Sequence, residues 1–261
     1  MASFDDLLQL LLVFALGLPR LMAIFIMIPI FSSAILPGSI RTAIAISLLL
    51  FIYPAFSEGV DLQAFTALQI AMLGLKEVVI GVLMGFGIAV LLWAVESAGY
   101  LIDNQRGSTM ASSVDPLTGS QTSPLGIFLT QVVAVFFMVG GGFFVMMAGI
   151  YESYVLFPVF EFFPKLSIEA ASHFLTILDR IVALAVLLAA PAMIAMFLSE
   201  FGLGLVSRFA PQLNVFFLSM GIKSAVGILI LILYVGLMGE IWENEIATIP
   251  SGISVLGGLL R

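Results

Sequence analysis

The side chains with which this chain could do chemistry are ionisable residues inside long apolar runs. Such residues are costly at membrane depth and are usually functional, although charges at the end of a span can simply lie near lipid headgroups. Six stand out: Lys76, Glu77, Glu96, Glu200, Arg208 and Lys223. Because adjacent residues do not face each other on a helix, Lys76 and Glu77 are each expected to need a partner elsewhere, on another chain for example. Glu200 and Arg208 share a helix face, where they could pair through a bridging residue or each bind a neighbouring subunit.

The residues required for catalysis or metal binding are largely missing. The chain has no cysteine and a single histidine, His173, so neither a zinc cluster nor a His-Glu-x-x-His protease motif can form. Neither a Gly-x-Ser-x-Gly elbow nor a phosphate-binding loop ending in Lys-Ser/Thr is present. We therefore expect no enzyme activity, no metal and no cofactor.

One segment is polar in an otherwise apolar chain. Residues 103–124 read DNQRGSTMASSVDPLTGSQTSP and contain only Met110, Val114 and Leu117 as large apolar residues. Gly107 permits a turn, and Asp115-Pro116 followed by Gly119 favours a second one. Two turns predict a compact loop that folds back on itself, of the kind that forms lids and binding segments; an ordinary solvent-exposed connection is the simpler alternative.

Composition places the chain among integral membrane proteins. It has 261 residues, of which 62% are hydrophobic and 10% are charged, against about 25% charged in a soluble domain. Net charge is −7 and no basic patch is present, so nucleic acid is excluded as a partner. Apolar stretches suited to helices lie at roughly 7–31, 42–56, 62–75, 78–102, 125–150, 174–205 and 213–239. These predict six or seven hydrophobic helical segments in a single all-α membrane-type subunit spanning 1–261.

Several of these stretches are interrupted, which predicts kinked helical hairpins in a larger assembly. Tyr53-Pro54 is expected to end the second stretch, and Lys76-Glu77 to separate the third from the fourth. Three consecutive glycines at 140–142 predict a hinge or a very close helix crossing. Gly81, Gly85 and Ala89 recur every four residues, so one face can approach another backbone, within this chain or on a neighbour. Ser167 is the expected N-cap of the following helix, with Glu169 in its first turn.

Two stretches resemble a known family. ESAGYLIDNQRGSTMASSVDP at 96–116 and LSEFGLGLVSRFAPQLNVFFLSMGIKS at 198–224 are similar to the SctT family of type III secretion export apparatus proteins, the injectisome counterparts of flagellar FliR. The resemblance extends over most of the chain, including LPRLMAIFIMIPIFSS and LKEVVIGVLMGF. The IDNQRG form is typical of the injectisome branch.

This resemblance implies a structural subunit of the export gate, joined to SctR and SctS in a closed helical hetero-oligomer. The gate lies at the bacterial inner membrane, in the needle-complex base, partly raised toward the periplasm. SctU wraps it, SctV lies below, and the inner rod and needle components lie above. Unfolded polypeptides pass through its centre. A secondary transporter or permease for a small molecule is the alternative, because broken helices beside charges also fit that class.

The resemblance also implies roles for particular residues. It assigns a pore plug loop to the segment 103–124, with these residues: Asp103, Asn104, Gln105, Arg106, Gly107, Ser108, Thr109, Met110, Ser112, Ser113, Asp115, Pro116 and Gly119. Residues in the apolar runs and in the second stretch are expected to serve subunit assembly: Lys76, Glu77, Glu200, Arg208, Pro211, Gln212, Asn214 and Lys223.

Overall fold

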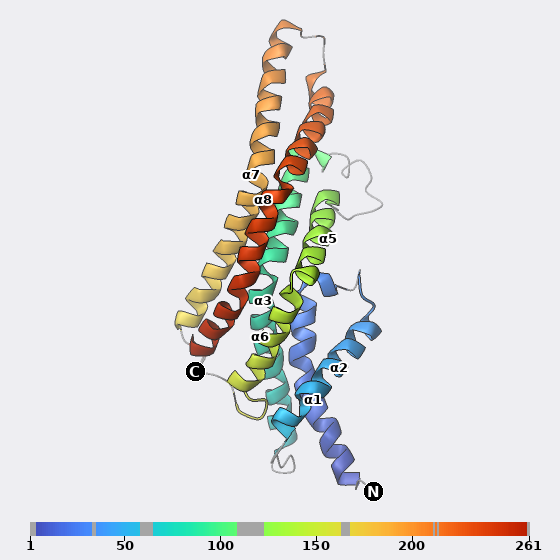
Figure 1. Ribbon diagram of the computed structural model, residues 1–261, viewed down its shortest axis with the longest axis vertical. Helices are drawn as coiled ribbons and strands as arrows, with labels where there is room; N and C mark the ends of the chain where they lie inside the picture. Colours follow the sequence, from blue (N-terminus) through green and yellow to red (C-terminus); the bar gives the residue numbers. More distant parts are fainter. Residues whose placement is uncertain are drawn as a thin grey trace. The chain divides into compact units, whose positions relative to one another are not determined.

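The computed structural model describes residues 4–32, 35–57, 65–108, 123–162, 168–210, 212 and 214–259. No strand occurs in these ranges, which confirms the all-α prediction. The elements, drawn in Figure 1, are α1 (Phe4–Met27), η1, a short 3₁₀ helix (Pro29–Phe31), α2 (Gly38–Ser57), α3 (Ala67–Arg106), α5 (Pro124–Val139), α6 (Gly142–Leu156), α7 (Ile168–Phe209) and α8 (Val215–Leu259).

Length and hydropathy single out the helices that could cross a membrane. Among the described residues, α3, α7 and α8 are each long and apolar enough, and α5 with α6 would add a fourth as one broken span. The apolar parts of α1 and α2 are shorter. A regular helix of 40 residues, the length of α3, is about 60 Å long, which is about twice the hydrocarbon thickness of a bilayer.

α3 is one helix where the sequence predicted two. A capping box begins it, since the Thr66 backbone N–H donates to Gln69 Oε1 (2.8 Å) and the Gln69 N–H donates to Thr66 Oγ1 (3.4 Å). It then continues through Lys76 and Glu77 and ends at Arg106. The predicted break at this pair is wrong because lysine and glutamate are good helix formers and both charges have partners beside the helix.

Proline does not end the helices in which it lies. α2 continues through Pro54 to Ser57, which corrects the predicted stop at Tyr53-Pro54. Pro19, Pro191 and Pro250 lie inside α1, α7 and α8. A proline removes one backbone hydrogen bond but leaves the rest of a long apolar helix intact.

Glycine does break the helices at the predicted place. α5 ends at Val139 and α6 begins at Gly142, and Gly141 between them has φ +81°, which lies in the left-handed region. A side chain at that φ would be strained, so the three glycines permit a break that other residues would resist. Further on, α7 begins at Ile168 with Glu169 in its first turn as expected, while Ser167 lies outside the described residues.

Contacts group the chain into two compact units, the first formed by residues 1–90, 141–177 and 246–261 and the second by 91–140 and 178–245. In the first unit, α1 crosses α3 where α3 presents Gly81 and Gly85. A Cβ built on Gly81 would lie 2.5 Å from the Arg20 carbonyl oxygen, and one on Gly85 would lie 3.0 Å from Ile24 Cα. The expected small-residue face therefore packs inside the chain, which was one of the two alternatives.

In the second unit, α7 and α8 form an antiparallel hairpin, drawn in yellow-orange to red in Figure 1. Its pairs confirm the direction: Glu200 meets Lys223, Met196 meets Gly227, and Arg180 meets Glu245. At Gly99 and Gly126, α3 and α5 approach so closely that neither position leaves room for a side chain. The Phe136 ring of α5 contacts the edge of buried Trp242 on α8, with centroids 5.2 Å apart.

Gly81→Ala should destabilise the protein although alanine favours a helix by about 1 kcal/mol over glycine. Its methyl would collide with backbone at the α1–α3 crossing, and overpacking costs about 1–3 kcal/mol. The matched control is Gly87→Ala on the same helix, where no atom lies within 4 Å of the new methyl. Thermal unfolding of the purified protein in detergent measures both; equal unfolding midpoints for the two variants would contradict the crossing.

Candidate functional site

A buried ion pair joins α1 and α3 in the first unit. Arg20 Nε donates to Glu77 Oε2 at 2.7 Å, and Arg20 Nη2 donates to Glu77 Oε1 at 2.9 Å. Both side chains are completely buried. Two parallel bonds between a planar guanidinium and a carboxylate fix distance and orientation together, so this pair sets how α1 lies on α3.

The remaining donors of Arg20 bind α6 and the residue that follows it. Nη1 donates to the Ser153 carbonyl at 2.7 Å, and Nη2 donates to the Phe157 carbonyl at 2.7 Å. The guanidinium carbon lies 4.1 Å from the centroid of the Tyr154 ring, whose hydroxyl donates to the Gly17 carbonyl at 2.8 Å. Arg20 therefore joins three helices through one side chain.

Lys76 extends the same network into the segment after α6. Its Nζ lies 2.9 Å from Glu77 Oε1 and donates to the carbonyls of Pro158 (2.7 Å), Val159 (2.9 Å) and Glu161 (2.9 Å). Two cations and one carboxylate leave this network with a net charge of +1. The carbonyl oxygens carry partial negative charge and offset it. Every charge in this buried network, Arg20–Glu77–Lys76, has a partner inside the chain.

This arrangement corrects one sequence-based interpretation. Lys76 and Glu77 do contact each other, and neither depends on another chain for a partner. Their role in subunit assembly stays a prediction. Arg20 belongs with them, because it too is an ionisable residue in an apolar run; its pairing over 57 positions leaves no local signal in the sequence.

At the end of α3, Asp103 connects the two ends of the polar segment. Its Oδ2 accepts from the Ser123 hydroxyl (2.6 Å) and from the Leu125 backbone N–H (2.9 Å), while Oδ1 lies 2.7 Å from Arg106 Nη2. Ser123 in turn caps α5 by accepting from the Gly126 N–H. A carboxylate at the first turn of a helix also interacts favourably with the helix dipole. One side chain therefore holds the end of α3 against the start of α5.

The structure places the predicted plug residues in two groups. Asp103, Asn104, Gln105 and Arg106 form the last turn of α3, so the loop begins later than predicted. Gly107 makes the predicted turn with φ +89°, and Ser108 donates to the Asp103 carbonyl. The others lie outside the described residues: Thr109, Met110, Ser112, Ser113, Asp115, Pro116 and Gly119.

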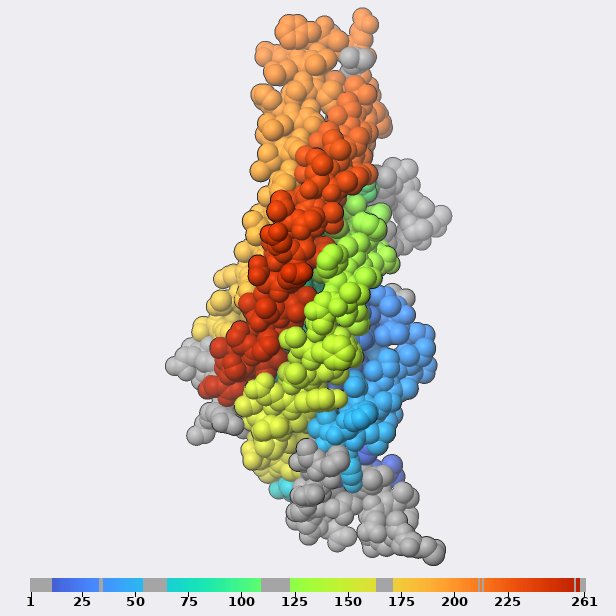
Figure 2. Space-filling view, viewed as in Figure 1, coloured from blue at the N-terminus to red at the C-terminus, as the bar shows by residue number. Residues whose placement is uncertain are grey.

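The predicted assembly residues of the second stretch gather at the connected ends of α7 and α8. Lys223 Nζ lies 3.2 Å from Glu200 Oε2, so Glu200 pairs across the hairpin and not with Arg208 as one alternative held. Arg208, Gln212 and Asn214 are exposed, and Pro211 lies outside the described residues. Arg208 makes no ion pair within the described part of the chain. Figure 2 shows this end of the hairpin in orange.

Large apolar side chains are also exposed at this end of the hairpin. Phe209 is 91% exposed and Phe217 is 70% exposed, and Phe201, Leu205, Val206 and Phe216 are exposed as well. Such a surface requires lipid or another protein. Among the described residues, no group of three or more histidine, cysteine, aspartate or glutamate side chains could hold a metal ion.

Glu77→Gln should lower the free energy of unfolding by about 3–5 kcal/mol, since Arg20 and Lys76 would lose the carboxylate that they share. The midpoint of thermal unfolding and the amount of chain in membranes measure the loss. Glu152→Gln on the exposed side of α6 is the control and should change stability by less than about 0.5 kcal/mol. The triple variant Arg20→Met, Lys76→Met, Glu77→Leu should restore only part of the stability, because it removes the unpaired charges but takes their donors from the carbonyls of Ser153, Phe157 and the segment after α6. Equal effects of the two single changes would refute the network's importance.

Known proteins resemble this chain along most of its length. The sequence profile of the bacterial export proteins, family 1, matches residues 11–249. The Yop proteins translocation protein T of Yersinia pestis is 46% identical over 227 residues, which cover 86% of both chains. The surface presentation of antigens protein SpaR of Salmonella typhimurium is 37% identical over 84% of this chain and 81% of its own. The flagellar biosynthetic protein FliR of Bacillus subtilis is 28% identical over 88% and 89%. The chain therefore belongs to the bacterial export proteins of family 1, the family of SctT and FliR.

Proposed function

We propose that this chain is a structural subunit of a type III secretion export gate, in which it forms, with SctR and SctS, the pore for unfolded secreted proteins. The observation that carries the proposal is the 46% identity to the Yop translocation protein over 86% of both chains. Identity to the flagellar relative is lower, at 28%, which favours the injectisome branch. The chain conducts polypeptide and catalyses nothing.

The helix lengths support a membrane subunit that extends beyond the bilayer, and in this proposal the surplus lies on the periplasmic side of the inner membrane. α3, α7 and α8 contain 40, 42 and 45 residues, and each would exceed a hydrocarbon layer of about 30 Å if it ran straight across. The apolar parts of these helices that extend beyond the lipid must be shielded from water by other proteins. Neighbouring subunits SctR and SctS provide this shielding in the proposal, with SctU around the gate, SctV below and the inner rod above.

The polar segment is proposed to plug the closed pore. Asp103 binds Ser123 and the Leu125 N–H, so the end of α3 and the start of α5, which flank residues 109–122 in the sequence, are tied together. Those residues include three serines and three threonines but only three large apolar side chains. Such a loop can leave the pore without giving up much buried apolar surface.

Replacing residues 109–121 by a short Gly-Ser linker should make resting cells leaky to ions and small dyes, because the plug would be lost while its anchors at Asp103 and Ser123 remain. Dye uptake by cells that produce the complex measures the leak. Asp103→Ala is a companion variant that frees the anchored ends and should leak less than the deletion. Normal permeability in a deletion variant whose complex still assembles would rule out a plug role.

Arg208→Ala should reduce co-purification with SctR and SctS by about tenfold or more, since arginine is enriched among the interface residues whose loss costs about 2 kcal/mol or more. Arg208→Lys keeps the positive charge but loses the planar guanidinium, so it shows which of the two the interface needs. Ser207→Ala is the neighbouring control, because the Ser207 hydroxyl donates to the Gly204 carbonyl within α7. Co-purification in mild detergent is the measurement. A normal complex with unimpaired secretion would exclude Arg208 from the interface. Purified chain that runs as a monomer and transports a small molecule alone would instead indicate a permease.

A further inference from the structure

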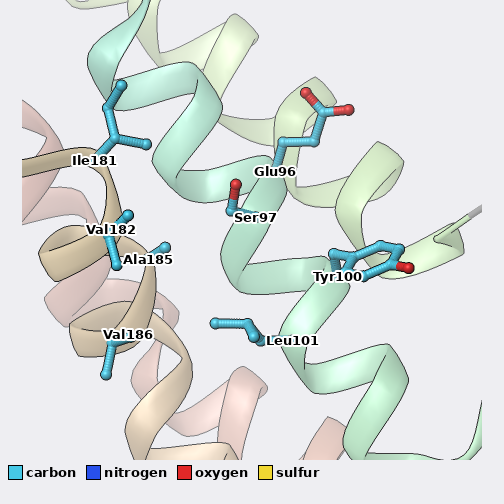
Figure 3. A pocket seen from close by; sticks show the side chains of 8 residues that line it. All are labelled: Glu96, Ser97, Tyr100, Leu101, Ile181, Val182, Ala185 and Val186. Carbon is cyan, nitrogen blue, oxygen red and sulfur yellow. The ribbon is translucent and has the colours of Figure 1, made fainter. Parts of the chain in front are cut away.

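An open groove of about 440 Å³ runs between α3 and α7 in the second unit. Figure 3 shows the residues that line it: Glu96, Ser97, Tyr100 and Leu101 from α3, and Ile181, Val182, Ala185 and Val186 from α7. No described residue of the plug segment or of the hairpin end lines it. The groove is therefore a separate feature of the surface.

The α7 side of the groove has a buried floor and an open wall. Ile181 and Ala185 are 6% and 4% exposed, whereas Val182 and Val186 are 57% and 52% exposed. Residues four apart lie on one helix face, so the two valines form an apolar edge one turn long. Alanine at the floor keeps the groove open to a closely approaching backbone.

The α3 side of the groove carries a carboxylate. Glu96 lies within the candidate span of α3, is exposed, and makes no ion pair with any residue that the structure describes. In Figure 3, Leu101 extends from α3 toward α7, while the Glu96 and Tyr100 side chains extend away from α7. A carboxylate in a membrane-spanning helix is costly without a cation or hydrogen-bond donor, and an acyl chain supplies neither.

We propose that this groove receives an apolar helix from another subunit of the export apparatus, one that places a lysine or arginine against Glu96. This inference rests on the proposed function. Apolar side chains three or four residues apart on the incoming helix would pack on Val182 and Val186, as in other helix-in-groove interfaces. Charge complementarity at Glu96 would then fix the register of that helix.

Photo-cross-linking in cells that carry the whole secretion system tests the occupant. The photoreactive residue p-benzoylphenylalanine replaces Val186 in one strain and Leu187 in another. Leu187 is the matched control because it is 53% exposed, against 52% for Val186, but does not line the groove. The expected result is a cross-link from position 186, stronger than from position 187, to an apolar peptide of another apparatus subunit that contains lysine or arginine.

Two other cross-linking results would distinguish a wrong assignment of the groove from a wrong proposed function. Cross-links only to lipid, in cells whose complex still co-purifies, overturn the groove's assignment and leave the export-gate role intact. Cross-links to a protein outside any secretion apparatus overturn both.

Charge reversal supplies an independent test. Glu96→Lys should lower the cross-link from position 186 by more than about tenfold, because like charges at an interface are strongly unfavourable. Glu96→Gln should lower it less. Changing the identified lysine or arginine of the partner to glutamate should restore the cross-link in the Glu96→Lys strain. Failure of that restoration, with the chain present at its normal level in membranes, would refute the proposed pairing.

Discussion

Burying an arginine and a glutamate among apolar helices is tolerable only when each charge meets the other and every remaining polar atom has a partner. Arg20 and Glu77 satisfy this condition with two direct bonds and with the carbonyls of Ser153 and Phe157. Apolar packing alone would let helices slide or rotate past one another, because it has little directional preference. The ion pair removes that freedom at the point where α1, α3 and α6 meet.

Close backbone approach makes this pairing geometrically accessible. Gly81 follows Glu77 by one helical turn and faces the Arg20 carbonyl, so α1 can lie near enough for the guanidinium to reach the carboxylate. A second close approach, at Gly99 and Gly126, brings α5 beside α3 just before Asp103 binds the start of α5. In both places a glycine contact lies about one turn from a charged side chain that fixes the orientation.

The glycine breaks and turns of this fold were predictable from sequence, whereas the continuation of α2 through Pro54 and the non-local pairings were not. The break at Gly141 and the turn at Gly107 follow from the ability of glycine to adopt positive φ. The positions of the glycines can be read directly from the sequence. Continuity of α3 across Lys76 and Glu77 was missed, because the residues that neutralise Lys76 lie at 158–161, more than 80 positions away. The pairing of Glu200 with Lys223 was missed for the same reason, since it requires the hairpin to be known first.

The position of Asp103 bears on how a plug could open without damaging the subunit. Its partners Arg106, Ser123 and Leu125 belong to the helix ends and not to residues 109–122. A conformational change confined to 109–122 therefore breaks none of these bonds. In the proposed plug role, the loop could therefore move while the bonds between the ends of α3 and α5 stay in place.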